Sequence, residues 1–262
     1  MKTRDARVLL TGASGGIGRA MARALVRSGA AVMLVGRSMP ALTALQRELD
    51  PTAQHAPERL CCHATDLCDP HALAGLCEAA QAWGVNVLIH NAGVPSFGRL
   101  DTLAPEALQQ MLHTNLLAPM LLTQALLPHL RKLARSQVIC IGSALGRLGL
   151  PGYSAYCASK FGLRGFAEAL RRELGDSPVR VQYLGPRSTR TDFNSASVQA
   201  YNEATGTASD SPEDVAQALL ALLESEAAER YLGFPETLAV RLNGLAPRLL
   251  DGAFRKHRLS LP

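Results

Sequence analysis

Short apolar runs alternate along most of the chain with longer segments in which apolar residues recur at helical spacing. The short runs are hydrophobic at consecutive positions, which is typical of strands buried on both faces of a parallel sheet. They predict strands at residues 7–11, 31–36, 59–64, 85–90, 137–142 and 179–184. The longer segments predict helices at residues 17–28, 40–49, 71–83, 105–130 and 154–174. This alternation indicates right-handed βαβ units, and therefore an α/β fold with a doubly wound parallel sheet.

Composition favours one folded unit without a nucleic-acid partner. Of the 262 residues, 47% are hydrophobic, which is enough for one sizeable core, and no Gly/Ser-rich linker or internal repeat divides the chain. We therefore expect a single domain over residues 1–262. The formal charge is +5, but Lys and Arg form no dense run among aromatic residues, so we expect no binding to nucleic acid.

We expect neither an export signal nor a metal site. The apolar stretch Val8-Leu9-Leu10 is too short for a signal peptide, and no window of about 18 apolar residues predicts a transmembrane helix. A cytoplasmic protein with six reduced cysteines is the expectation. Four cysteines lie near two histidines, but Cys61 and Cys62 are adjacent and would point to opposite faces of a strand. We interpret them as packing residues.

A glycine-rich segment follows the first predicted strand and opens the first predicted helix. It reads Thr11-Gly12-Ala13-Ser14-Gly15-Gly16-Ile17-Gly18. Glycines in such a turn let backbone N–H groups approach a pyrophosphate, and the helix N-terminus supplies partial positive charge. The segment therefore predicts a dinucleotide site, the alternative being a plain tight turn between strand and helix.

The end of the second predicted strand indicates which dinucleotide is bound. NAD sites usually place Asp or Glu here to bind the ribose 2′-hydroxyl, but this chain has Gly36-Arg37. The Arg37 guanidinium can pair with a 2′-phosphate, so NADP(H) is preferred and NAD(H) is the alternative cofactor. Arg37 could also be a solvated loop residue. Asp66, after the third strand, is placed either to meet the adenine or to cap the next helix.

Candidate proton chemistry lies further along the chain. Tyr156 and Lys160 are four residues apart, so in a helix their side chains share one face, and a nearby cation lowers the pKa of a phenol. Tyr156 would then serve as acid or base, while Ser143, at the end of the fifth strand, would hydrogen-bond a developing alkoxide. Alone, the Tyr–Lys pair would be an ordinary exposed helix face.

Taken in order with Asn91-Ala92-Gly93 after the fourth strand and Asn115 in the long helix, these motifs resemble the short-chain dehydrogenase/reductase family. The resemblance is to the branch with a TGxxxGxG loop and a YxxxK active site, and it covers roughly residues 5–195. It implies a Rossmann-type domain with about seven parallel strands and helices on both faces.

The resemblance also implies roles for individual residues. The catalytic tetrad would be Asn115, Ser143, Tyr156 and Lys160, with Lys160 also bonded to the nicotinamide ribose and Asn115 holding a water. The implied cofactor-binding residues are Gly12, Ser14, Gly16, Ile17, Gly18, Arg37, Asp66, Leu67, Asn91, Ala92, Gly93, Tyr156, Lys160, Pro186, Thr189 and Thr191. The Asn91-Ala92-Gly93 segment could instead only shape its turn.

The segment after the sixth strand departs from the family pattern of Pro-Gly followed by a Thr that binds the nicotinamide carboxamide. Pro186 and Thr191 match, but Arg187 replaces the glycine. We expect the Arg187 side chain to point to solvent, the alternative being contact with an anionic substrate. Residues 187–211 are expected to be the substrate loop, whose polar composition suits a closing loop or a disordered one.

The C-terminal part is predicted to be a last strand at 231–234 and a helical extension at 235–258, which Pro247 breaks or divides. Four leucines recur at near-helical spacing, and arginines follow another face at 241, 248 and 255. The favoured interpretation is a helix packed on its own subunit or on a dimer partner. The alternative is a basic amphipathic segment in peripheral contact with a membrane or a lipid-like substrate. The leucines in question are Leu238, Leu242, Leu245 and Leu249.

These expectations converge on an NADP(H)-dependent carbonyl reductase or alcohol dehydrogenase that acts on a small-molecule carbonyl or alcohol. The apolar tail hints at a lipophilic substrate, which the sequence does not identify. The alternative is a non-redox protein on the same scaffold, either an NADP(H)-binding regulator or a hydrolase that reuses Ser143 and Tyr156. Family habit suggests a homodimer or homotetramer.

Overall fold

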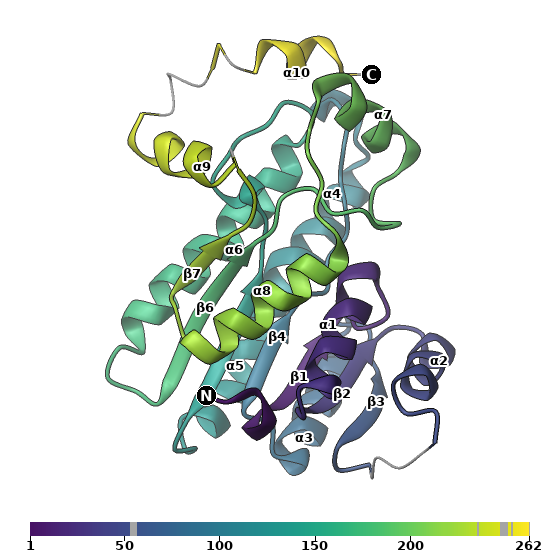
Figure 1. Ribbon diagram of the computed structural model, residues 1–262, viewed down its shortest axis with the longest axis vertical. Helices are drawn as coiled ribbons and strands as arrows, with labels where there is room; N and C mark the ends of the chain where they lie inside the picture. Colours follow the sequence, from purple (N-terminus) through teal and green to yellow (C-terminus); the bar gives the residue numbers. More distant parts are fainter. Residues whose placement is uncertain (53–56, 235, 247–250, 253, 262) are drawn as a thin grey trace.

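Seven parallel strands form one sheet in the order β3-β2-β1-β4-β5-β6-β7 (Figure 1). The computed structural model describes residues 1–52, 57–234, 236–246, 251–252 and 254–261. The strands are β1 (Arg7–Thr11), β2 (Ala31–Gly36), β3 (Leu60–Ala64), β4 (Val87–His90), β5 (Ser136–Ile141), β6 (Val179–Gly185) and β7 (Glu229–Tyr231). The main helices are α1 (Gly16–Arg27), α2 (Met39–Leu49), α3 (Pro70–Trp83), α4 (Pro105–Leu112), α5 (Ala118–Leu130), α6 (Ser154–Glu173), α7 (Ala196–Thr205), α8 (Pro212–Ser225), α9 (Glu236–Leu245) and α10 (Arg255–Leu259).

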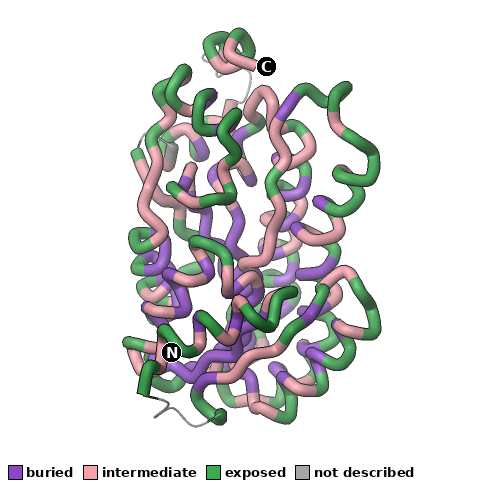
Figure 2. Tube along the Cα trace, turned by 90° about the vertical axis from the view of Figure 1, so that its right-hand side faces the viewer, coloured by how far each residue is buried: buried purple, intermediate pink, exposed green. Residues whose placement is uncertain are grey.

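Helices cover both faces of the sheet, because successive strand residues point to opposite sides and both sides are apolar. In β1, Val8 and Leu10 pack against α1, α2 and α8, whereas Leu9 packs against α3, α5 and α6. All three side chains are fully buried. Figure 2 shows the buried residues concentrated in the interior and the exposed residues at the periphery. The predicted doubly wound Rossmann-type sheet is therefore confirmed.

The long helix predicted at 105–130 is interrupted. A π-helical turn, His113–Leu117, separates α4 from α5 and contains Asn115, which is fully buried. Hydrophobic periodicity could not reveal this turn, because one extra residue in a single turn barely changes the apolar pattern. Such turns often occur at functional sites. The last strand also lies earlier than predicted, at β7 instead of 231–234.

Asp66 does not cap the third helix. The cap of α3 is Asp69, whose carboxylate accepts hydrogen bonds from the N–H groups of His71 at 2.8 Å and Ala72 at 3.4 Å. Pro70 occupies the first helical position, where its missing N–H costs nothing. Asp66 instead accepts from the Cys68 N–H and stays exposed, which leaves its position beside the cavity described below.

The segment 187–211 contains a helix that packs on the rest of the protein, which fits the expected closing loop better than the disordered alternative. It contains α7, in which Val198 and Tyr201 are buried with 5% and 3% exposure. The Ser195 side chain caps this helix by accepting from the Val198 N–H. The two buried side chains hold the segment against the rest of the protein, and the cap stabilises its helix, although most of its side chains are small and polar.

The C-terminal segment folds back over the body of the protein, but its leucines do not make the contact. Leu238, Leu242 and Leu245 of α9 are 48%, 45% and 85% exposed, so these leucines do not pack on their own subunit, and their packing on a dimer partner stays a prediction. Among the residues of α9 whose burial is described, Val240 is the buried one, and it forms a cluster with Ala144 and Leu148. Pro235, Pro247, Arg248 and Leu249 lie outside the described residues.

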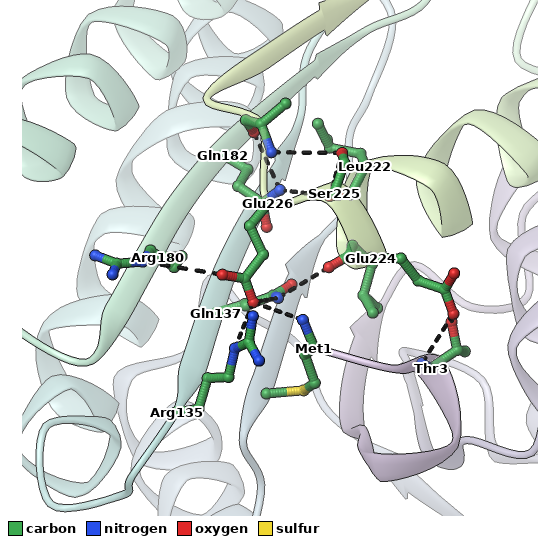
Figure 3. A network of polar contacts seen from close by, with 12 residues as sticks. Met1, Thr3, Arg135, Gln137, Arg180, Gln182, Leu222, Glu224, Ser225 and Glu226 are labelled. Carbon is green, nitrogen blue, oxygen red and sulfur yellow. Dashed lines mark hydrogen bonds and ion pairs between the residues drawn. The ribbon is translucent and has the colours of Figure 1, made fainter.

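Polar contacts join the ends of several elements at the edge of the sheet where β5 and β6 begin (Figure 3). The Glu226 carboxylate accepts hydrogen bonds from the amino group of Met1 at 2.6 Å, Arg135 Nε at 2.6 Å and Gln137 Nε2 at 3.0 Å. Burial acts to raise the pKa of Glu226, but these donors outweigh it and hold that pKa at about 2. The network fixes the end of α8 to β5, opposite the carboxyl ends of the strands.

None of the helices in the described ranges is long and apolar enough to span a membrane. All six cysteines are free thiols, and three of them are buried. Within the same ranges, no three His, Cys, Asp or Glu side chains gather as a set of metal ligands.

Candidate active site

A cavity of about 620 Å³ lies at the carboxyl ends of the strands. This is where ligands bind in open parallel sheets, since the strand order reverses there between β1 and β4. Nearly all residues that the sequence singled out line this one cavity, from Gly12 at one end to Thr191 at the other. The two exceptions are Gly18 and Asn115, which lie behind its wall.

The N-terminus of α1 opens into the cavity without a side-chain cap. Its N-cap is Gly15, which offers no side chain to the first N–H groups of the helix. Gly12 has a φ of +64°, and a Cβ on Gly18 would lie 2.1 Å from the Gly12 carbonyl oxygen, so the loop and the helix touch backbone to backbone. Uncapped N–H groups at a helix start suit a phosphate, so the residues present fit a pyrophosphate.

A polar clamp joins the loops after β1 and β4. The Thr11 hydroxyl accepts from the N–H groups of Asn91 and Ala92 at 2.9 and 3.0 Å and donates to the Ile89 carbonyl at 3.2 Å. The Asn91 amide donates to the carbonyls of Thr11 and Gly12 at 3.1 and 3.0 Å. Asn91 thus fixes the glycine loop as well as its own turn. Thr11 was not singled out from the sequence, although it opens the glycine motif.

Arg37 and Asp66 lie at the far end of the cavity from Tyr156. Both are exposed and follow neighbouring strands, Arg37 after β2 and Asp66 two residues beyond β3. No acidic side chain follows β2 at the position where a ribose 2′-hydroxyl is usually bound, because Gly36 stands there. The donor set therefore fits a dinucleotide with a 2′-phosphate better than one without.

Tyr156 and Lys160 project from one face of α6 toward the cavity. Lys160 Nζ lies 5.7 Å from the centre of the Tyr156 ring and donates to the Ile141 carbonyl oxygen at 3.3 Å. Lys160 is 5% exposed, and its pKa falls to about 8 because burial disfavours the charged form. The pair is therefore not an exposed helix face.

The pKa of Tyr156 moves in the opposite direction from the one predicted. Burial raises it above the ordinary tyrosine value, and a hydrogen bond with the Ser143 side chain only partly offsets this. The expectation that Lys160 lowers this pKa is not met, because burial is the largest effect on the phenol. At neutral pH the phenol holds its proton and is ready to donate it.

Ser143 is held by Tyr183, a residue that the sequence did not single out. The Ser143 N–H donates to the Tyr183 hydroxyl, which in turn donates to the Ser143 carbonyl, both at 3.0 Å. Tyr183 lies in β6, next to β5 in the sheet, and is 2% exposed. The signal that could have pointed to it is a tyrosine in a predicted strand next to the one that ends at Ser143.

Asn115 faces the loop after β4 and not the open cavity. Its side chain accepts from the Val94 N–H at 2.8 Å and donates to the Val94 carbonyl at 3.0 Å and to Ser159 Oγ at 3.2 Å. Gly93 lies between Asn115 and Lys160, since a Cβ there would be 3.3 Å from Asn115 Oδ1 and 3.8 Å from Lys160 Nζ. The π turn thus places Asn115 close to Lys160, with Gly93 between the two side chains.

Arg187 does not point to solvent, contrary to expectation. Its guanidinium forms an ion pair with Asp210 at 2.7 Å, with the two side chains only 17% and 11% exposed. The side chain lies over Gly233, where a Cβ would be 2.6 Å from Arg187 Cδ. Pairing with Asp210 neutralises the charge and removes the basis for contact with an anionic substrate. The ion pair joins both ends of the segment 187–211.

Comparison with known proteins agrees with this geometry. A family model described as short chain dehydrogenase matches residues 6–202. Dehydrogenase/reductase SDR family member 7B of Bos taurus is 36% identical, over 98% of this chain and 84% of its own length. A metagenomic short-chain oxidoreductase in complex with NADP is 33% identical, with a TM-score of 0.71 over 86% of this chain and 96% of its own. The chain belongs to the short-chain dehydrogenase family.

Proposed function

We propose that the protein is an NADP(H)-dependent oxidoreductase that interconverts a carbonyl compound and an alcohol. The observation that carries this proposal is the meeting of Ser143, Tyr156 and Lys160 in the same cavity as the uncapped N-terminus of α1. Relatives bound to this type of cofactor support it, since a Sphingobium yanoikuyae short-chain dehydrogenase in complex with NADPH is 25% identical, with a TM-score of 0.80 over 94% of this chain and 95% of its own.

The cofactor would be held along the length of the cavity. The N–H groups at the start of α1 would bind its pyrophosphate, Arg37 its 2′-phosphate, and Asp66 and Leu67 its adenine. Pro186, Thr189 and Thr191 border the opposite end, where the nicotinamide would lie. When bound, the nicotinamide supplies or accepts the hydride.

The side chains of the site would handle the oxygen of the substrate. Ser143 and Tyr156 would both donate hydrogen bonds to a carbonyl oxygen, and Tyr156 would transfer its proton as negative charge develops there. Because burial raises the pKa of Tyr156, the phenol is protonated at neutral pH, which favours carbonyl reduction over alcohol oxidation. Lys160 would contribute a positive charge beside the phenol.

A hydrolase that uses Ser143 as a nucleophile is less well supported. Serine nucleophiles need a base within hydrogen-bonding distance, most often histidine. In the described part of the chain, Ser143 exchanges hydrogen bonds with Tyr183, Leu145 and Tyr156 and with no histidine. An NADP(H)-binding regulator differs from an enzyme only in turnover, which can be measured directly.

The test is oxidation of NADPH, followed by its absorbance, with a panel of aldehydes, ketones and 3-oxoacyl thioesters. Tyr156→Phe removes the proton donor, so turnover should be lost while NADPH affinity, measured by fluorescence titration, stays near wild type. Tyr231→Phe, which removes a phenol from β7 outside the cavity lining, is the matched control and should retain turnover. Tight NADPH binding without turnover across the panel would contradict the proposal and favour the regulator.

We also propose that the protein is a cytoplasmic homodimer or homotetramer. Leu117, Met120 and Phe161 are 42%, 38% and 42% exposed near the start of α5 and on α6, and large apolar side chains on adjacent helices are typical of subunit interfaces. Light scattering after gel filtration measures the mass directly. Peripheral membrane contact through 235–258 stays a prediction, since the leucines of α9 are exposed and Arg241 lies among them.

A further inference from the structure

The substrate end of the cavity is built by segments far apart in the sequence. Beyond Tyr156 its lining includes Phe97 after β4, Tyr153 before α6, and Phe193 before α7. The C-terminal segment completes it with Phe254 and His257. Figure 1 shows α7 and α10 together at this end of the molecule, where they also contact each other.

Aromatic rings form a continuous wall next to the reacting group. The ring of Tyr153 lies 4.9 Å from that of Phe97 and 6.2 Å from that of Tyr156, measured between centroids. Phe193 contacts Tyr156 edge to face at 6.3 Å. Aromatic walls of this kind bind flat apolar groups, because ring pairs prefer stacked or edge-to-face contacts and exclude water. A group attached to the carbonyl carbon would meet this wall.

This end of the cavity offers no free positive charge among its described lining residues. Arg187 is neutralised by Asp210, and Lys160 lies behind Tyr156 against the Ile141 carbonyl. His257 shares a hydrogen bond of 2.8 Å with the Tyr201 hydroxyl, and burial lowers its pKa, so it is neutral at physiological pH. A carboxylate placed here would lose its hydration without gaining a cation, which is costly.

The C-terminal helix closes the outer side of this space. Besides the bond to His257, the Tyr201 hydroxyl donates to the Pro151 carbonyl at 3.3 Å, which joins α10, α7 and the loop before α6. Leu261 reaches the same loop, where a Cβ on Gly152 would lie 2.5 Å from Leu261 Cδ2. The space beyond Tyr156 is thus bordered on that side by α10.

We propose that this end of the cavity takes an uncharged carbonyl compound with an aromatic or similarly bulky apolar group, and that Phe97 and His257 determine this preference. The proposal rests on the proposed function, since it assumes that the reacting carbonyl lies at Tyr156. Phe97 would pack on the apolar group, and His257 would position the closing helix through Tyr201.

Four substrates separate charge from bulk: ethyl benzoylformate, benzoylformate, ethyl pyruvate and pyruvate. The first two share an aromatic ring and differ in charge, whereas the two esters share neutrality and differ in bulk. We expect kcat/KM for ethyl benzoylformate to exceed that for each of the others by roughly tenfold or more, because burial of a phenyl ring is worth at least that factor and a buried carboxylate without a cation costs at least as much. Equal or better turnover of benzoylformate or ethyl pyruvate would overturn the proposal.

Variants test the two residues. Phe97→Ala and His257→Ala should lower kcat/KM for ethyl benzoylformate by roughly tenfold and change that for ethyl pyruvate by no more than about twofold. Leu259→Ala is the control on the same helix, because Leu259 is 72% exposed and outside the cavity lining. An equal loss with both esters would show a general structural defect and contradict a role in selectivity.

Measurement of substrate binding distinguishes an error in the proposed substrate preference from an error in the proposed function. Each compound is titrated into the enzyme–NADPH complex, and NADPH fluorescence reports its binding. Selective binding of ethyl benzoylformate without turnover supports the subsite and contradicts the proposed function. Equal binding of the ester and the acid overturns the subsite, while turnover of any carbonyl compound leaves the proposed function standing.

Discussion

Lys160 Nζ lies 5.7 Å from the centre of the Tyr156 ring, and the two groups titrate in different pH ranges. Burial lowers the pKa of Lys160 to about 8 and raises that of Tyr156 above its ordinary value. The lysine therefore loses its charge in a range where the phenol still holds its proton. Under the proposed function, the charge of Lys160 and not the proton of Tyr156 would set the upper pH limit of proton donation.

Carbonyl reduction should therefore decline as the pH rises through about 8, the pKa of Lys160. Below that pH the ammonium is charged and kcat/KM should be nearly constant; above it the charge beside the phenol disappears. The measurement is kcat/KM for NADPH-dependent reduction from pH 6 to 10. Lys160→Met should be poorly active without this decline, and a wild-type profile that stays flat to pH 10 would contradict the assignment.

Arg37→Asp should shift the cofactor preference from NADPH toward NADH. The new carboxylate would repel a 2′-phosphate and accept a hydrogen bond from a 2′-hydroxyl. Because a charge-assisted hydrogen bond contributes about 1.5–3 kcal/mol, the ratio of kcat/KM for NADPH over NADH should fall by roughly one hundredfold. Arg27→Asp, on an exposed position of α1 outside the cavity lining, should leave the ratio unchanged. An unchanged ratio in Arg37→Asp would rule out contact with the 2′-phosphate.

Removal of Arg187 should loosen the segment that borders the cavity. Arg187→Met leaves the Asp210 carboxylate largely buried and without its cation, and Asp210 Oδ2 has no hydrogen-bond partner in the described structure. We expect a loss of about 2 kcal/mol in the free energy of unfolding, measured by urea denaturation. Arg187→Met combined with Asp210→Asn should recover part of that loss. Additive losses in the double variant would show that the two side chains do not stabilise each other.

Glu226 should make stability depend on pH at the edge of the sheet opposite the cavity. Its pKa of about 2 lies below the unfolded value, so its contribution is complete above the unfolded pKa and is lost as the pH falls toward 2. At pH 7 we expect Glu226→Gln to lower the free energy of unfolding by about 2–3 kcal/mol. Urea denaturation at pH 7, 5, 4 and 3 should show the difference between wild type and variant shrinking. A constant difference would assign the effect to packing and not to charge.

The sheet was predictable because two features of the sequence indicate each strand. The strand itself is continuously apolar, and the segments between strands have helical spacing of their apolar residues. β1 and β2 have the predicted bounds, β3 to β6 differ at their ends by one or two residues, and β7 lies two to three residues earlier than predicted. β4 begins at Val87 instead of residue 85, since the Asn86 side chain bonds to Arg7 N and Asp5 O beside β1. Side-chain contacts of this kind decide strand ends and leave no periodic pattern.

The site was predictable where chemistry follows a fixed spacing and not where it depends on contacts across the fold. Tyr156 and Lys160 face the same cavity because four residues make one helical turn. The raised pKa of Tyr156, by contrast, results from burial that several elements create together. The pairing of Arg187 with Asp210 and the reach of His257 to Tyr201 likewise join residues whose separation in sequence carries no signal.

The side chain of Arg187 also restricts what can stand at position 233. It fills the space that a Cβ on Gly233 would need, and Gly233 has a φ of +84°, which glycine adopts without strain. Glycine at 187 would remove the steric obstacle at 233 but not the backbone strain, so glycine at 233 is required twice, by its positive φ and by the Arg187 side chain. Arginine at 187 therefore depends on glycine at 233, whereas glycine at 233 does not depend on arginine at 187.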